Sequence, residues 1–133
     1  MYVNFDDKDY VFKGDGVKAT ATKNTTTNVD LKVTEDFIYV NGAEFIQANS
    51  VMGDYVECQV VDIDNVLGYG ANTVLTQYIT KWYLDPSTSR FCLESPYAGG
   101  VPNGCYMRVK YHSVGTTNDV DICINYFFHK GEA

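Results

Sequence analysis

Oxygen-bearing side chains gather in one segment of the chain, VVDIDNVLGYG at residues 60–70. Asp62, Asp64 and Asn65 run into a glycine loop, and closely spaced carboxylate and amide oxygens are ligands that Ca²⁺ prefers. The spacing departs from the EF-hand pattern, because Asn65 follows Asp64 directly and Gly68 comes too late. The alternative is a strand end whose Asp and Asn side chains bond the loop backbone. We favour this alternative and therefore expect no cofactor and no metal, with calcium as the weaker candidate.

Groups suited to nucleophilic or acid–base catalysis are few and scattered. The two histidines, His112 and His129, each fall at the outer end of a predicted strand, and no GxSxG motif accompanies them. The Gly-Tyr-Gly at 68–70 does not join a strand to a long helix, as a nucleotide loop does. A glycosidase needs two carboxyls facing each other across a cleft. The carboxylates on predicted strand surfaces are instead dispersed: Glu35, Asp36, Glu44 and Glu57. We therefore predict no catalytic residues and a protein that is not an enzyme.

The four cysteines, Cys58, Cys92, Cys105 and Cys123, form no CxxC pair, which excludes zinc-ribbon and thioredoxin motifs. Cys58, Cys105 and Cys123 fall in the longer predicted strands, where cysteine behaves as a small hydrophobe. The start, MYVNFDDKDY, has neither a basic nor an apolar region, so we expect no secretory signal. We accordingly predict four reduced thiols and no disulfide.

These groups are carried by a chain with a β composition. It has 16 Val and 12 Thr against 5 Leu, and 14% of its residues are aromatic. Period-two alternation predicts half-buried strands, of which the last is the clearest and the most central. The predicted strands are 17–22, 29–34, 55–63, 105–111 and 120–128, with a short one at 91–93. Lys13–Gly16 is predicted as a turn, and Asn41-Gly42 as a type I′ turn between strands 37–40 and 43–46.

One segment departs from the β pattern. Apolar residues recur at helical spacing from Val74 to Trp82, so we predict one short helix at about residues 72–83. With about seven strands, the chain is expected to be a single all-β domain over residues 1–133 with an N-terminal arm at 1–12. The predicted fold is an antiparallel β-sandwich of the jelly-roll type, and an immunoglobulin-like sandwich is the alternative.

The charge of the chain limits its partners. Its 133 residues carry a net charge of −7, and the pI is about 4.6. This balance argues against nucleic acid, whose phosphates need clustered Lys and Arg, and against anionic lipid surfaces. No apolar run approaches the roughly 20 residues of a membrane span. We therefore expect neither nucleic acid nor a membrane as a partner.

The chain resembles small virion structural proteins of tailed bacteriophages. The resemblance rests on residues 60–75 (VVDIDNVLGYGANTVL) and 106–130 (YMRVKYHSVGTTNDVDICINYFFHK), and it extends back to residues 18–42. It implies a head-decoration, neck or tail component that occurs in many copies. Its partners would be copies of itself and other virion proteins, in a virion assembled in the host cytoplasm. The resemblance carries over no catalytic residue.

The N-terminal arm is the predicted partner-binding segment. It combines aromatic side chains with three Asp, which suits an interface with apolar anchors and a charged rim. The predicted contact residues are Tyr2, Phe5, Tyr10 and Phe12. A glycan- or receptor-binding β-sandwich module is the alternative function, because aromatic residues in predicted loops, Tyr69 among them, are also suited to sugar binding.

Overall fold

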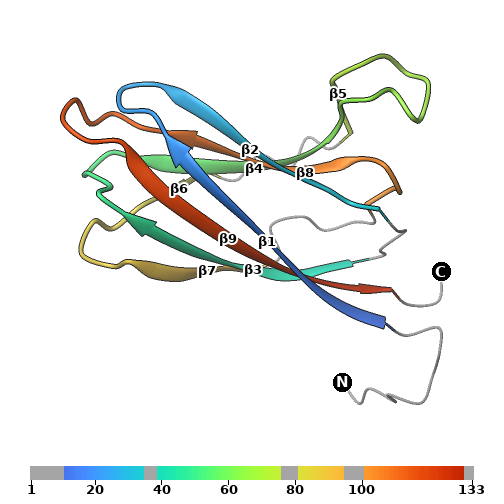
Figure 1. Cartoon of the computed structure of the whole chain (residues 1–133), viewed down its shortest axis with the longest axis horizontal. Coiled ribbons are helices and arrows are strands. Elements are labelled where there is room, and N and C mark those ends of the chain that lie inside the picture. The colour runs from blue at the N-terminus through green and yellow to red at the C-terminus, as the bar shows by residue number, and fades with distance from the viewer. Residues whose placement is uncertain (1–10, 35–38, 76–80, 95–100, 131–133) are drawn as a thin grey trace.

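The protein is a sandwich of two antiparallel sheets (Figure 1). The computed structural model describes residues 11–34, 39–75, 81–94 and 101–130, and it contains no helix within these ranges. The first sheet has the spatial order β1 (Val11–Ala21), β9 (Val120–Lys130), β3 (Tyr39–Ala48) and β7 (Arg90–Glu94). The second has the order β2 (Thr26–Lys32), β8 (Tyr106–His112), β4 (Tyr55–Asp62) and β5 (Thr73–Val74), and β6 (Lys81–Tyr83) also pairs with β4. The predicted all-β sandwich is confirmed.

The core lies between the sheets and is made by alternate residues of the long strands. On β8, Met107, Val109 and Tyr111 are fully buried, while the residues between them face outward and are partly exposed. The Tyr111 ring stacks on Phe45 of the opposite sheet, with ring centroids 6.2 Å apart. The other strands contribute the same inward rows: Val29, Leu31, Ala43, Val56, Cys58, Val60, Val120, Ile122, Ile124 and Tyr126. This period of two is the pattern that the sequence predicted for 29–34, 55–63, 105–111 and 120–128.

The predicted Asn41-Gly42 hairpin is wrong. Both residues lie inside β3, and the register against β9 shifts between Val40 and Gly42, so Asn41 is the extra residue of a β-bulge. Asn-Gly suits a bulge as well as a turn, since both conformations need backbone angles that these residues tolerate. Pairing with β9 on one side and with β7 on the other holds the strand extended through this point.

The predicted helix at 72–83 is also absent from the described part of that segment. Thr73 and Val74 form β5 and residues 81–83 form β6, and both pair with β4; residues 76–80 lie outside the described ranges. The free edge of β4 offers backbone groups that need partners, and β-branched residues suit the pleated surface. Tertiary pairing therefore overrides the helical spacing.

Two smaller boundaries differ as well. Lys13–Gly16 is not a turn, because β1 runs straight through it and pairs with residues 125–128. Val11 and Phe12 belong to β1 and not to an N-terminal arm. Strands β8 and β9 lie in different sheets, and the loop 113–119 crosses between them. Strand β9 does lie centrally, between β1 and β3, as predicted.

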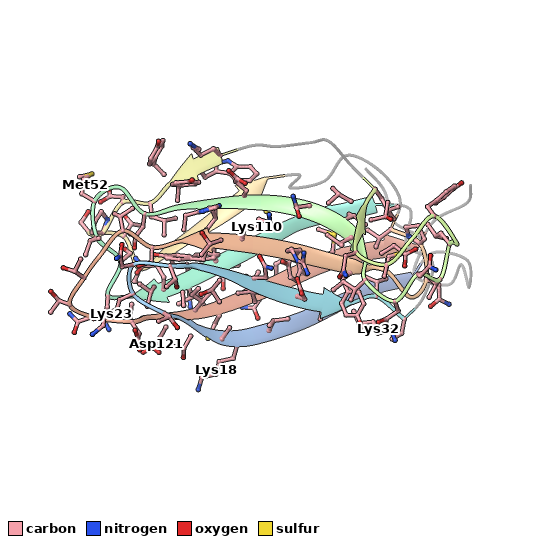
Figure 2. The ribbon with its side chains drawn as sticks, turned by 90° about the horizontal axis from the view of Figure 1, so that it is seen from above. Lys18, Lys23, Lys32, Met52, Lys110 and Asp121 are labelled. Atoms are coloured by element: carbon pink, nitrogen blue, oxygen red, sulfur yellow. The ribbon has the colours of Figure 1, made fainter. Side chains whose placement is uncertain are left out.

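Four loops meet at one end of the sandwich. The register places the end of β1 beside the start of β9, and the starts of β2 and β4 beside the end of β8. Residues 22–25, 49–54, 84–89 and 113–119 therefore share this end, which we call the loop end (Figure 1, left). In Figure 2, Met52 and Lys23 lie at the loop end, and Lys32 lies toward the other. The loop 63–72 lies at the opposite end, where Val11 pairs with Lys130.

Candidate functional site

Asp62, Asp64 and Asn65, the candidate calcium ligands, form hydrogen bonds with different partners. The Asp62 carboxylate is fully buried and accepts the N–H groups of Val66 at 2.9 Å and Leu67 at 3.0 Å. Asp64 accepts the Tyr106 hydroxyl at 2.8 Å, and its Oδ2 lies 3.6 Å from Lys32 Nζ.

Asn65, with a φ of 59°, accepts the Gly70 N–H at 2.8 Å. Among the described residues, no group of three His, Cys, Asp or Glu side chains converges for a metal. The contacts of Asp62 and Asn65 are those expected of a strand end whose side chains bond the loop backbone.

The predicted contact residues of the N-terminal segment are divided. Tyr2, Phe5 and Tyr10 lie outside the described residues. Phe12 lies in β1 opposite His129 of β9. The structure therefore brings Phe12 into the sheet, while the other three stay a prediction.

The histidines do not share a site. His129 lies near the end of β9, in the first sheet, and His112 ends β8, in the second. The His112 ring stacks on Tyr55, with centroids 4.2 Å apart, and its Nδ1 lies 2.9 Å from Thr26 Oγ1. Its Nε2 lies 3.6 Å from Glu57 Oε2. The ring therefore lies between a threonine hydroxyl and a glutamate carboxylate, in a partly exposed row across β2, β8 and β4.

The three described thiols, Cys58, Cys105 and Cys123, are free. Burial raises the pKa of Cys58 to about 12, which keeps that thiol protonated and unreactive. The pKa of Cys105 is also raised, by burial and then by the charge of Asp62. The side chain of Cys92 lies outside the described residues. Cys58 and Cys105 are therefore core residues, whereas Cys123 is only partly buried, between the inward-facing Ile122 and Ile124.

The buried carboxylate of Asp54 connects the loops at the loop end. Asp54 is 0% exposed and accepts three hydrogen bonds: from Tyr111 Oη at 2.7 Å, from Val114 N at 2.8 Å and from Val51 N at 3.2 Å. Its own backbone oxygen accepts the Leu84 N–H at 2.9 Å. One residue thus ties together three of the four loops, and its charge is compensated by hydrogen bonds.

The hydrogen bonds of Asp54 position three solvent-exposed apolar side chains. Residues 51–54 form a four-residue turn, which the Asp54 N–H closes by donating to Val51 O at 3.1 Å. Gly53 has a φ of +101°, as a type II turn requires, and the Val51 N–H donates to the Asp54 carboxylate across the same turn. Met52 is at the tip of this turn and is 80% exposed. A Cβ on Gly53 would lie 3.1 Å from Val114 Cγ2, so the two loops touch. We call Val51, Met52 and Val114 the loop-end patch; Val51 and Val114 are 39% and 48% exposed.

A hollow opens beside the patch. Its volume is about 270 Å³, and Tyr83, Leu84, Asp85 and Thr88 line it. Tyr83 is 66% exposed, whereas Leu84 is buried. Ser87 donates both its N–H and its hydroxyl to Asp85 Oδ1, at 2.9 and 2.7 Å. These bonds lower the pKa of Asp85, so its carboxylate is ionised at neutral pH.

The strands predicted at 43–46 and 55–63 leave Gly53 in the connection between them, but Asp54, Met52 and Tyr83 were not singled out from the sequence. One signal was present: two apolar residues, Val51 and Met52, stand directly before a turn glycine, where polar residues are usual. Asp54 carried no such signal, because its partners Tyr111 and Val114 are about sixty residues away.

Comparison with protein-family models, curated proteins and solved structures gives no significant match. Within the described ranges, no helix has the length and hydropathy to cross a membrane. The function is therefore inferred from the geometry of the loop end together with the resemblance noted above.

Proposed function

We propose that the chain is a non-enzymatic structural protein of a tailed-phage virion, which acts through protein–protein contacts in an assembly of many copies. The observation that carries the proposal is the loop-end patch. A methionine 80% exposed at a turn tip, flanked by two exposed valines, is an apolar surface that water does not favour. A contact with another subunit removes that surface from water.

The rigidity of the loop end supports a binding role. Asp54 fixes the Met52 turn, the start of the 113–119 loop and the backbone at Leu84 through hydrogen bonds. A patch held in place loses little conformational entropy when a partner covers it. Methionine is also common at contact surfaces, because its flexible thioether adapts to the partner.

The strand order supports the jelly-roll version of the sandwich. The chain alternates between the sheets at β1, β2, β3 and β4, and again at β7, β8 and β9, while β5 and β6 share the place beside β4. Jelly rolls are built from two such interleaved Greek keys, and viral capsid proteins use them widely. In an immunoglobulin-like sandwich, by contrast, the first two strands lie in the same sheet. The fold is thus in keeping with the phage resemblance, although fold alone does not assign function.

The glycan-binding alternative has less support. Tyr69 and Tyr83 are 79% and 66% exposed, the highest values among the described large aromatic residues. Tyr69 lies in the 63–72 loop, however, and Tyr83 lies at the loop end. Rings at opposite ends of the sandwich do not make one sugar-binding platform.

Sedimentation of the purified chain tests the proposal. We expect self-association that grows with concentration, and Met52→Asp is expected to weaken it by about tenfold or more, since burying a Met side chain is worth roughly 1.5–3 kcal/mol. Tyr69→Asp is the matched control, because it places the same charge on an equally exposed apolar side chain at the other end. A chain that stays monomeric at every concentration, or equal losses in both variants, would contradict the assignment.

A further inference from the structure

We infer that the hollow lined by Tyr83, Leu84, Asp85 and Thr88 receives an arginine side chain of the partner protein. This inference deepens the proposed function, since it identifies the chemistry of the partner surface that meets the loop end. The hollow, at about 270 Å³, is below the usual range for drug-sized ligands, roughly 300–1,000 Å³. Its size suits one long side chain.

The lining matches a guanidinium group on an aliphatic stem. Leu84 offers an apolar wall, and the exposed ring of Tyr83 offers a face on which a planar cation stacks. Asp85 supplies the negative charge. Oδ1 already accepts two hydrogen bonds from Ser87, whereas Oδ2 accepts only the Thr88 hydroxyl at 3.4 Å, so Oδ2 has a lone pair for a further N–H group. Within the described residues, no Lys, Arg or His forms an ion pair with Asp85.

The hollow is already shaped before any ligand arrives. Thr88 N–H donates to Asp85 O at 3.0 Å, and the side chain of the buried Gln47 donates to Thr88 O at 3.0 Å. Leu84 N–H is bonded to Asp54 O, which links the hollow directly to the loop-end patch. A rigid carboxylate beside a rigid apolar patch binds an arginine at low entropic cost.

Charge favours a cation over a neutral ligand. The chain carries a net charge of −7, which attracts a basic partner surface. Lys81 shows that these rings accept a cation, since its Nζ lies 4.3 Å from the Tyr55 centroid and 5.5 Å from that of Tyr83. Its positive charge also opposes a second cation nearby. Replacing Lys81 by Met should therefore strengthen binding.

The test is an amide NMR titration of the full chain with the capped tripeptide Gly-Arg-Gly. We expect saturable shifts at Leu84, Asp85 and Thr88. Asp85→Asn should weaken binding about tenfold and Tyr83→Leu about threefold. Asp121→Asn is the matched control, because it removes an exposed carboxylate on β9 and should leave the affinity unchanged.

Three results would overturn the inference. They are the absence of saturable shifts at the hollow, equal affinity for the uncharged citrulline tripeptide, and stronger shifts there with methyl glucoside than with the arginine tripeptide. The last result would assign the hollow to a glycan. The outcome is separate from that of the Met52→Asp sedimentation test, which measures self-association at the patch and uses no peptide.

Discussion

The Tyr111 hydroxyl offers a direct measure of how burial strengthens a hydrogen bond in this protein. Tyr111 is 0% exposed and donates to the fully buried Asp54 at 2.7 Å. Burial, and then the bond to Asp54, raises the pKa of Tyr111 above its ordinary value, so the hydroxyl stays a donor at every physiological pH. Tyr111→Phe removes that donor alone and keeps the ring in its stack on Phe45.

The expected change in the free energy of unfolding follows from the hydrogen bonds that Asp54 keeps in the Tyr111→Phe variant. Asp54 keeps its bonds to Val51 and Val114 but loses its shortest one, and no water replaces it in a fully buried position. A hydrogen bond to a charged group contributes about 1.5–3 kcal/mol, so we expect Tyr111→Phe to lower the free energy of unfolding by that amount. Asp54→Ala leaves three donors unsatisfied and should cost more, about 3–5 kcal/mol.

Tyr106→Phe is the matched control on the same strand. Tyr106 donates to Asp64 at 2.8 Å, but this pair is exposed and solvated. Its loss should change stability by less than about 0.5 kcal/mol. Urea unfolding, followed by tryptophan fluorescence with the slope held in common, measures both variants. Equal costs for Tyr111→Phe and Tyr106→Phe would refute the reasoning, because burial would then add nothing.

Four further predictions concern other parts of the chain. Stability should fall as the pH rises from 9.0, the ordinary pKa of a thiol, to about 12, the pKa of Cys58 in the folded protein. Over this range the folded state holds a proton that the unfolded chain releases, and urea unfolding midpoints measured across it check the prediction. Gly53→Ala should cost about 1–2 kcal/mol through its φ of +101°. Gly115→Ala, whose added Cβ would also lie 3.1 Å from a valine methyl but which has no positive φ, should cost less in the same assay. Deleting residues 1–10 should leave the melting temperature unchanged but weaken self-association, whereas deleting 1–12 also shortens β1 and should lower the melting temperature; normal association of the shorter deletion would contradict a contact role for Tyr2, Phe5 and Tyr10. EDTA should not shift the melting temperature, because Asp62 and Asn65 already bond the loop backbone, and a clear shift that calcium reverses would restore the calcium site.

The alternation of apolar and polar residues was sufficient to predict the strands that have one buried face. The period of two assigns residues 56–60 of β4, 107–111 of β8 and 120–126 of β9 alternately to the core and to the surface before any partner is known. The central position of β9 followed from the same source, since a long strand with a continuous apolar face needs neighbours on both edges.

Segments with two compatible local conformations were decided only by the tertiary structure. Asn41-Gly42 suits a turn and a bulge alike, and pairing with β7 and β9 selected the bulge. The stretch from Thr73 to Tyr83 has helical spacing, yet the open edge of β4 drew its described ends into strands. In both cases the deciding partners are distant in sequence, and their hydrogen bonds outweigh a weak local preference.

The loop end is the clearest product of tertiary structure. Four loops that are far apart in sequence meet there only because the strand register aligns the ends of both sheets. Asp54 was one acidic residue among many in the sequence, and folding made it a buried acceptor for Val51, Tyr111 and Val114. The sequence by itself determined the β composition, the acidic charge and the inward rows, because these depend on residue type and on a period of two. The site depends on which loops become neighbours, and only the pairing of the strands decides that.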